Sequence, residues 1–227
     1  VHLAELLSAV VLFQLSEPGC PVVSGVGSAV AEMRSGGYLA ASPEIGLINM
    51  ICLEMSRFYG LLTQATGVSA DSSAVDFQAG SEGGMTGLCA ALAGADSLIA
   101  AGAFEGVQST SLAKMVLDAE QVGALRRYIR ESPVDEATTL MADILEVGIG
   151  GHYLGRRSTR AFARSEVWRP ALFSRGGGEA GAPRAPLLKR AVARADELLA
   201  THEVAPLSED AEREIAAILA SHADRCP

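Results

Sequence analysis

Residues 42–66 read SPEIGLINMICLEMSRFYGLLTQAT and predict one helix followed directly by one strand. Ser42 suits the N-cap, because its hydroxyl can accept a hydrogen bond from the first free amides, and Pro43 suits the first helical position. Glu44 then lies near the positive end of the helix dipole. Gly60 ends the helix after residue 59, and residues 61–66 form a short apolar run typical of a buried strand.

The same alternation extends outward on both sides of this stretch. Further strands are predicted at residues 21–25 and 97–101, and further helices at residues 3–15, 77–93 and 111–130. Short apolar strands separated by helices are typical of a parallel sheet that is covered on both faces. Three strands cannot close an eight-stranded barrel, which takes about 250 residues. The pattern therefore predicts an α/β fold, either a small open sheet or part of a barrel whose earlier strands are absent.

The second half of the chain is predicted to be helical, with helices at residues 135–147, 186–200 and 208–222. Residues 147–155 read VGIGGHYLG, and four glycines around His152 predict a tight loop, because glycine is unfavourable inside helices. A purely structural helix-to-helix connection explains this loop as well as a functional one does. The glycines and proline of residues 176–183 predict a flexible surface segment.

The composition excludes several classes of protein. Of 227 residues, 49% are hydrophobic, which suits a globular protein with a large core. The four cysteines are far apart and show no metal-ligand spacing, so no metal site is predicted and the thiols are expected to stay reduced, as in the cytoplasm. No stretch is predicted to cross a membrane. The chain opens inside a helical pattern, as though it began partway through a larger protein.

The net charge of −9 comes entirely from the first part of the chain. Residues 1–124 hold 3 basic and 12 acidic side chains, whereas residues 125–227 hold 15 of each. This acidity disfavours nucleic acid and anionic membranes as partners, and it is compatible with a cationic substrate. A solvated acidic face that keeps the protein soluble would explain it equally well.

Candidate catalytic residues follow from the strand ends, because the active sites of parallel α/β folds lie at the carboxyl ends of the strands. Glu105 follows the third predicted strand, and its carboxylate could face a cation or act as a general acid or base. Asp71, in the loop after residues 61–66, suits the same roles. A helix cap or ion pair at Glu105, and a turn at Asp71, are the structural alternatives.

Five further residues are candidates for binding the substrate. Tyr38 offers an aromatic face to a methylammonium group through a cation–π interaction, and Phe104 would shield Glu105. Packing roles are the alternative for both rings. The remaining candidates are the polar residues Ser24, Thr66 and Gln78.

A series of motifs in a fixed order resembles the trimethylamine methyltransferase family, over nearly the whole chain. The motifs include LLSAVVLFQLSEPGCPVVSG at residues 6–25, MRSG at 33–36, SPEIGLIN at 42–49, RFYGL at 57–61, DFQAGSE at 76–82, LAGAD at 92–96, KMVLD at 114–118, VDEATT at 134–139, VGIGGHYLG at 147–155 and WRPALFSR at 168–175.

The resemblance implies a fold and an architecture. It is to the carboxyl-terminal half of a protein about twice as long, which contains a TIM-type (β/α)8 barrel. Residues 1–130 would then be later βα units of that barrel, and residues 131–227 a C-terminal helical region packing on it. Only standard residues lie near Thr66–Asp71, which resembles the non-pyrrolysine branch of the family. Ile99 departs from the polar or aromatic residue that relatives often have in the third strand.

The resemblance also implies a function. The family moves a methyl group from a tertiary or quaternary amine, such as trimethylamine or a betaine, to the corrinoid of a separate protein, and this chain would hold no corrinoid tightly itself. The enzyme would be an incomplete methyltransferase in this chain, and a homo-oligomer. The arginine-rich tail would contact the corrinoid protein or another subunit. The alternative is a non-catalytic fragment or paralogue that binds a small amine or a protein partner.

Overall fold

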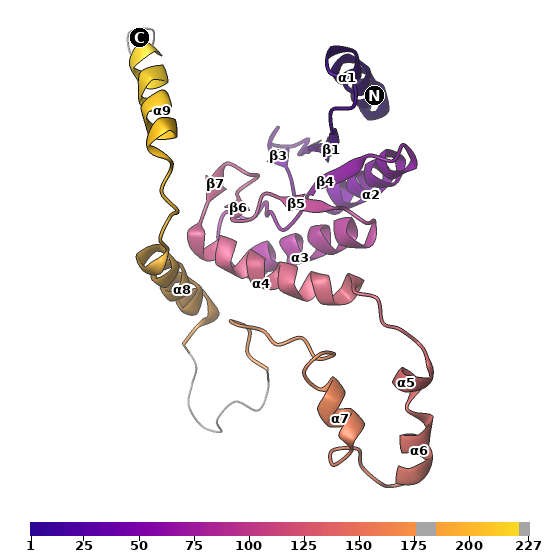
Figure 1. Cartoon of the computed structure of the whole chain (residues 1–227). Helices are drawn as coiled ribbons and strands as arrows, with labels where there is room; N and C mark the ends of the chain where they lie inside the picture. Colours follow the sequence, from indigo (N-terminus) through magenta and orange to yellow (C-terminus); the bar gives the residue numbers. More distant parts are fainter. Residues whose placement is uncertain (176–184, 223–227) are drawn as a thin grey trace. The chain divides into compact units, whose positions relative to one another are not determined.

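A computed structural model describes residues 1–175 and 185–222 of the chain. The chain forms two compact units, Val1–Ala195 and Asp196–Pro227. The first unit contains a sheet of three parallel strands in the order β1 (Val23–Val26), β4 (Leu62–Thr66) and β5 (Ser97–Ile99) (Figure 1). The register places Val23 opposite Leu62 and Thr66 opposite Ile99. The predicted α/β class and its three parallel strands are confirmed, and no closed barrel is formed by the described residues.

Among residues 1–175 and 185–222, helices cover one face of this sheet and leave the other uncovered, which differs from the predicted sheet covered on both faces. Burial alternates along the strands, because successive side chains of a strand point to opposite faces. Ser24, Val26, Thr63 and Ala65 are fully buried beneath the helices. The other face, called the open face below, is exposed or half-exposed and consists of Val23, Gly25, Leu62, Gln64, Thr66, Ser97 and Ile99.

The covering helices are α2 (Pro43–Phe58) and α3 (Phe77–Leu92), and α4 (Leu112–Ile129) packs against α3. Ser42 and Asp76 occupy the predicted N-cap positions of α2 and α3. The core beneath the sheet is built from Val26, Leu53, Ala65 and Ala90. Small side chains keep these layers close: a Cβ atom at Gly83 would lie 2.9 Å from the carbonyl oxygen of Val68.

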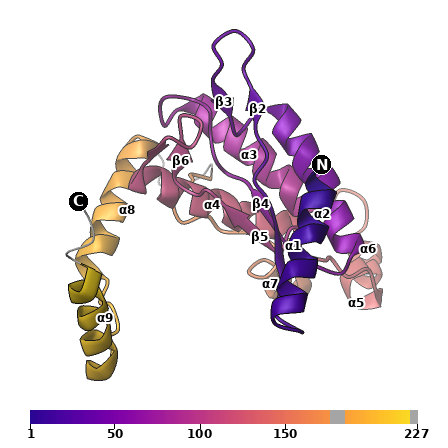
Figure 2. The ribbon, with the colours of Figure 1, turned by 90° about the horizontal axis from the view of Figure 1, so that it is seen from above.

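Two short antiparallel hairpins escape prediction from the sequence. Hairpin β2 (Val30–Ala31)–β3 (Tyr38–Leu39) lies between β1 and the next helix, and Figure 2 shows it standing out beyond the strand ends. The second hairpin is β6 (Ala103–Phe104)–β7 (Ser109–Thr110). Each strand has two residues, which is too short to show any hydrophobic period.

The helical part is more broken than the sequence predicts. The helix expected over residues 135–147 consists of α5 (Glu136–Thr139) and α6 (Met141–Val147), separated by Leu140 in the left-handed region at φ 52°. The loop at residues 147–155 is present as predicted, and it leads into an unpredicted helix, α7 (Arg157–Phe162). The predicted segment at residues 176–183 lies outside the described residues.

The remaining helices agree closely with prediction: α1 (His2–Ser16), α8 (Leu187–Thr201) and α9 (Glu209–His222). Among the residues with described positions, no helix combines the length and the apolar character needed to span a bilayer. The division of the chain at residue 130 stays a prediction.

Candidate active site

The loops that leave the carboxyl ends of β4 and β5 are tied to one another and to hairpin β2–β3. We call residues 38–41, 67–72 and 100–107 the carboxyl-edge cluster. Its loops are joined by backbone hydrogen bonds, among them Ala70 N to Ala103 O (3.2 Å), Glu105 N to Ser72 O (2.9 Å) and Gly106 N to Ala70 O (3.2 Å). The candidate residues in these loops are therefore held in one place, as the strand-end argument predicts.

Asp71 connects the β4 loop to the end of the hairpin. Its carboxylate oxygens accept hydrogen bonds from the backbone amides of Ala40 (2.7 Å) and Ala41 (3.1 Å). Hydrogen bonds to an ionised acceptor are roughly twice as strong as neutral ones. The Asp71 carboxylate is thus engaged in holding the segment that carries Tyr38.

Glu82, on α3, holds the same loop through hydrogen bonds to its backbone, a role that the sequence does not predict. Its Oε2 accepts from the backbone amides of Asp71 (2.8 Å) and Ser72 (3.1 Å), and its Oε1 accepts from Gln78 Nε2 (2.6 Å). Gln78 thus contacts Glu82, and its own side chain is exposed at the start of α3. From the sequence, Glu82 is predicted to lie on the exposed surface of a helix. Its role is not visible there because its partners are backbone amides ten and eleven residues away.

Glu105 and Tyr38 lie in neighbouring segments. Glu105 is exposed, has a left-handed backbone (φ 56°) and accepts a hydrogen bond from Ser109 Oγ (2.8 Å). Its neighbour Gly106 packs against Tyr38: a Cβ atom at Gly106 would lie 2.6 Å from the Tyr38 carbonyl oxygen and 3.8 Å from its ring. The Tyr38 side chain is 49% exposed, and Phe104 is half-buried. The structure therefore brings a carboxylate and an aromatic ring, both accessible, to one edge of the sheet.

The two strand residues among the candidates lie on opposite faces. Thr66 belongs to the open face, opposite Ile99, and its hydroxyl donates to the carbonyl oxygen of Val26 (3.3 Å). Ser24 is fully buried on the other face, where its hydroxyl shares a 2.7 Å hydrogen bond with that of Ser56 in α2. The Ser24 hydroxyl thus faces a helix rather than the carboxyl edge.

A buried ion pair supports the whole cluster. Lys114 Nζ lies 2.7 and 2.9 Å from the carboxylate oxygens of Asp118 and donates to the carbonyl oxygen of Val68 (2.6 Å). Asp118 Oδ2 also accepts from the backbone amide of Gly102 (2.7 Å). Burial raises the pKa of Asp118, while the hydrogen bonds from Lys114 and Gly102 and the Lys114 charge act in the opposite direction.

This pair joins the loops after β4 and β5, and it holds a strained residue. Val68 has a φ of 58°, a left-handed conformation that is costly for a β-branched side chain. Ala100, Glu105 and Val107 also have positive φ values, so strain gathers in this cluster. The sequence contains one signal of the Lys114–Asp118 ion pair, because a lysine and an aspartate four residues apart lie next to each other on the surface of a helix.

The arrangement is suited to binding an organic cation. A carboxylate and an aromatic face are the two groups that attract a methylated ammonium ion. No group of three or more histidine, cysteine or acidic side chains in the described ranges could hold a metal ion. The exposed His152, in the loop after α6, lies outside the carboxyl-edge cluster.

Comparison with known proteins shows which sequences this chain is similar to. The family model for trimethylamine methyltransferase (MTTB) matches residues 1–227. Trimethylamine methyltransferase MttB of Methanosarcina barkeri is 33% identical over 220 residues, covering 96% of this chain and 44% of the relative. Glycine betaine methyltransferase of Desulfitobacterium hafniense is 33% identical over 219 residues, covering 96% and 46%. The chain spans less than half the length of these relatives and corresponds to their C-terminal part.

Proposed function

The chain belongs to the trimethylamine methyltransferase family, and from this membership we propose that it is the C-terminal part of a corrinoid-dependent methyltransferase. The substrate would be a tertiary or quaternary methylated amine, the class that the names of the two relatives above contain. The observation that carries the proposal is the family match over the entire chain, together with a carboxyl edge that presents Glu105 beside the segment of Tyr38.

We propose that the three parallel strands are later units of a (β/α)8 barrel. Each strand of the parallel sheet is followed along the chain by a helix, β1 by α2, β4 by α3 and β5 by α4, with a short hairpin inserted after β1 and after β5. This alternation is the repeating unit of such a barrel. The helices lie on one face of the sheet, as the outer helices of a barrel do. The open face would then be the barrel interior, and its position supports Thr66 as a substrate-binding residue.

The methyl acceptor is proposed to be a corrinoid carried by a separate protein, which acts as the second substrate. In this proposal the residues of this chain bind and orient the amine, and the corrinoid stays with its carrier protein.

The charge change during the reaction decides the role of Glu105. The positive charge of the ammonium nitrogen disappears as its bond to the departing methyl carbon breaks. A carboxylate beside that nitrogen therefore stabilises the bound substrate more than the transition state, and an interaction of this kind does not raise kcat. We assign Glu105 and Tyr38 to binding and orientation, with Phe104 and Gln78 at the rim, and Asp71 to positioning the Tyr38 segment.

The test is methyl transfer from trimethylamine or glycine betaine to reduced cobalamin, followed by the absorbance of methylcobalamin. We expect Glu105→Gln to raise the KM for the amine about tenfold, as loss of one charged contact does, without lowering kcat. Glu17→Gln, at an exposed glutamate just after α1, is the control.

Calorimetric titration of the same amines separates this proposal from the alternative function. Amine binding that depends on Glu105, without methyl transfer, would support a small-amine-binding module instead. Absence of both binding and transfer would contradict both functions.

A further inference from the structure

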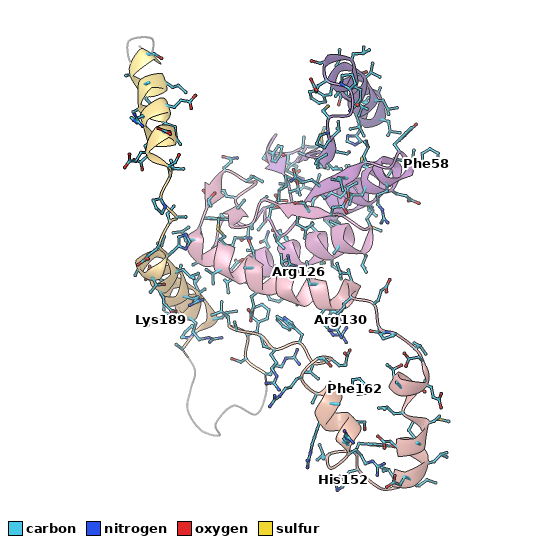
Figure 3. The ribbon with its side chains drawn as sticks, in the orientation of Figure 1. Phe58, Arg126, Arg130, His152, Phe162 and Lys189 are labelled. Carbon is cyan, nitrogen blue, oxygen red and sulfur yellow. The ribbon has the colours of Figure 1, made fainter. Side chains whose placement is uncertain are left out.

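A second polar feature lies away from the carboxyl edge, at the end of α4. Five arginines line one shallow hollow of about 350 Å³, together with Gly123, Ser165, Val167 and Trp168. We call it the arginine hollow, and its arginines are Arg126, Arg127, Arg130, Arg164 and Arg169. Figure 3 labels Arg126 and Arg130 on α4, where they border this hollow.

Ion pairs and hydrogen bonds hold one side of the arginine hollow in place. Arg127 Nη2 and Arg130 Nη2 each contact one carboxylate oxygen of Glu166, at 3.2 and 2.6 Å. Arg130 Nη1 also donates to the carbonyl oxygen of Ser165 (2.9 Å), and Arg127 Nε donates to that of Glu166 (3.0 Å). These bonds fix residues 164–169 against α4 and hold two of the five guanidinium groups in place.

The segment around Trp168, which also lines the arginine hollow, is held on α4 as well. Trp168 packs on α4 at Gly123, where a Cβ atom would lie 3.3 Å from the indole Nε1. The Glu120 carboxylate accepts hydrogen bonds from the backbone amides of the three residues 171–173, which holds the chain just after Trp168 on the same helix. The arginine hollow is thus a fixed feature of the first compact unit.

The charge of the arginine hollow is not balanced by the residues that the structure describes. Glu166 offsets one of the five guanidinium charges, which leaves a formal charge of +4 in a chain whose net charge is −9. Arg126, Arg164 and Arg169 form no ion pair with any residue in the described part of the chain. The C-terminus of α4 supplies only about half a negative charge. An external anion would remove the mutual repulsion of these arginines.

We propose that the arginine hollow binds a small molecule through a phosphate or diphosphate group. The planar fork of arginine matches phosphate oxygens, and several guanidinium groups can contact one multiply charged phosphate at the same time. The volume of the hollow is in the range of small-molecule sites. Trp168 already has Phe173 against it (centroids 6.4 Å apart) and the Arg175 guanidinium over its ring (5.6 Å). We therefore expect the arginines, rather than the indole ring, to make the contacts that recognise the ligand.

Calorimetric titration of pyrophosphate into the full chain, at constant ionic strength set by sodium chloride, tests this site. We expect one binding site, and we expect Arg126→Ala and Arg164→Ala each to weaken binding about tenfold, as the loss of a charged hydrogen bond does. Arg160→Ala removes an exposed arginine of α7 that does not line the hollow, and it should leave the affinity unchanged. Equal melting temperatures of all variants would show that the fold is intact.

Three results would overturn the proposal. The first is the absence of pyrophosphate binding at millimolar concentration. The second is equal loss of affinity in the Arg160→Ala control, which would indicate general charge attraction. The third is binding of a hexaglutamate peptide without binding of pyrophosphate, which would assign the arginine hollow to an acidic protein segment.

Discussion

Replacement of Lys114 by methionine tests whether the buried ion pair holds the carboxyl-edge cluster together. Lys114 is 2% exposed, and its ammonium group contacts both Asp118 and the Val68 carbonyl. Lys114→Met leaves a buried carboxylate without its cation, which costs about 3–5 kcal/mol in comparable sites. A typical domain has only about 5–15 kcal/mol of stability, so the expected loss is a large part of the total.

The loss should depend on pH with a definite sign. Burial raises the pKa of Asp118, and removal of the Lys114 cation should raise it further, so the folded variant would bind a proton that the unfolded chain releases. A raised carboxyl pKa gives stability below the unfolded value, near 4, that is lost as pH rises through the folded pKa. The deficit of Lys114→Met should therefore be smaller at low pH than at pH 8.

Urea unfolding, followed by the fluorescence of the single tryptophan Trp168, measures these effects as midpoint and slope. The chain has only one other lysine, Lys189, which is exposed on α8; Lys189→Met should change stability by no more than about 0.5 kcal/mol. The double variant Lys114→Met/Asp118→Leu should be more stable than Lys114→Met, because it removes the unpaired charge. A loss below about 1 kcal/mol for Lys114→Met, or a double variant less stable than the single one, would refute the reasoning.

Three further perturbations follow from the structure. Gly106→Ala should cost about 2–4 kcal/mol in urea unfolding, because a left-handed residue gains a Cβ against a backbone carbonyl; Gly150→Ala, left-handed in open space, should cost about 1–2. Hydrogen bonds from the backbone amide and the hydroxyl of Thr63 in β4 lower the pKa of Asp96. The stability that the ionised Asp96 contributes is therefore present above about pH 4 and lost as the pH falls below it. Asp96→Asn should flatten the pH dependence of the melting temperature in that range. Glu120→Ala frees three backbone amides beyond Trp168, and its fluorescence should shift to the red; an unchanged spectrum would contradict the anchoring role.

Local signals in the sequence predict most elements of the fold. Ser42 and Pro43 begin α2 at the predicted place, and Gly60 lies just beyond its end, because caps and helix-ending residues act on their own neighbours. The faces of the sheet were harder to predict. Val23, Leu62 and Ile99 are apolar although they lie exposed on the open face, so the strands read as short apolar runs even though helices cover one face.

The positions of the candidate residues in the fold were more predictable from the sequence than their contacts. The strand-end rule placed Asp71 and Glu105 in the carboxyl-edge cluster. The partners of Asp71 are amides about thirty residues earlier, contributed by a hairpin too short to show a pattern. Leu140 interrupts a helix with a left-handed backbone conformation, which a leucine in the sequence does not predict. Contacts of this kind depend on tertiary packing, which no local pattern contains.

The alternation of the strands has an evolutionary consequence. Ser24, Val26, Thr63 and Ala65 hold the helices, whereas Gln64, Thr66, Ser97 and Ile99 point to the opposite side of the same strands. Mutations on the open face can therefore accumulate without disturbing the residues that keep the helices in place. Evolution can therefore change the face that packs on the helices and the face that points away from them separately, because the two faces are built from different residues of each strand.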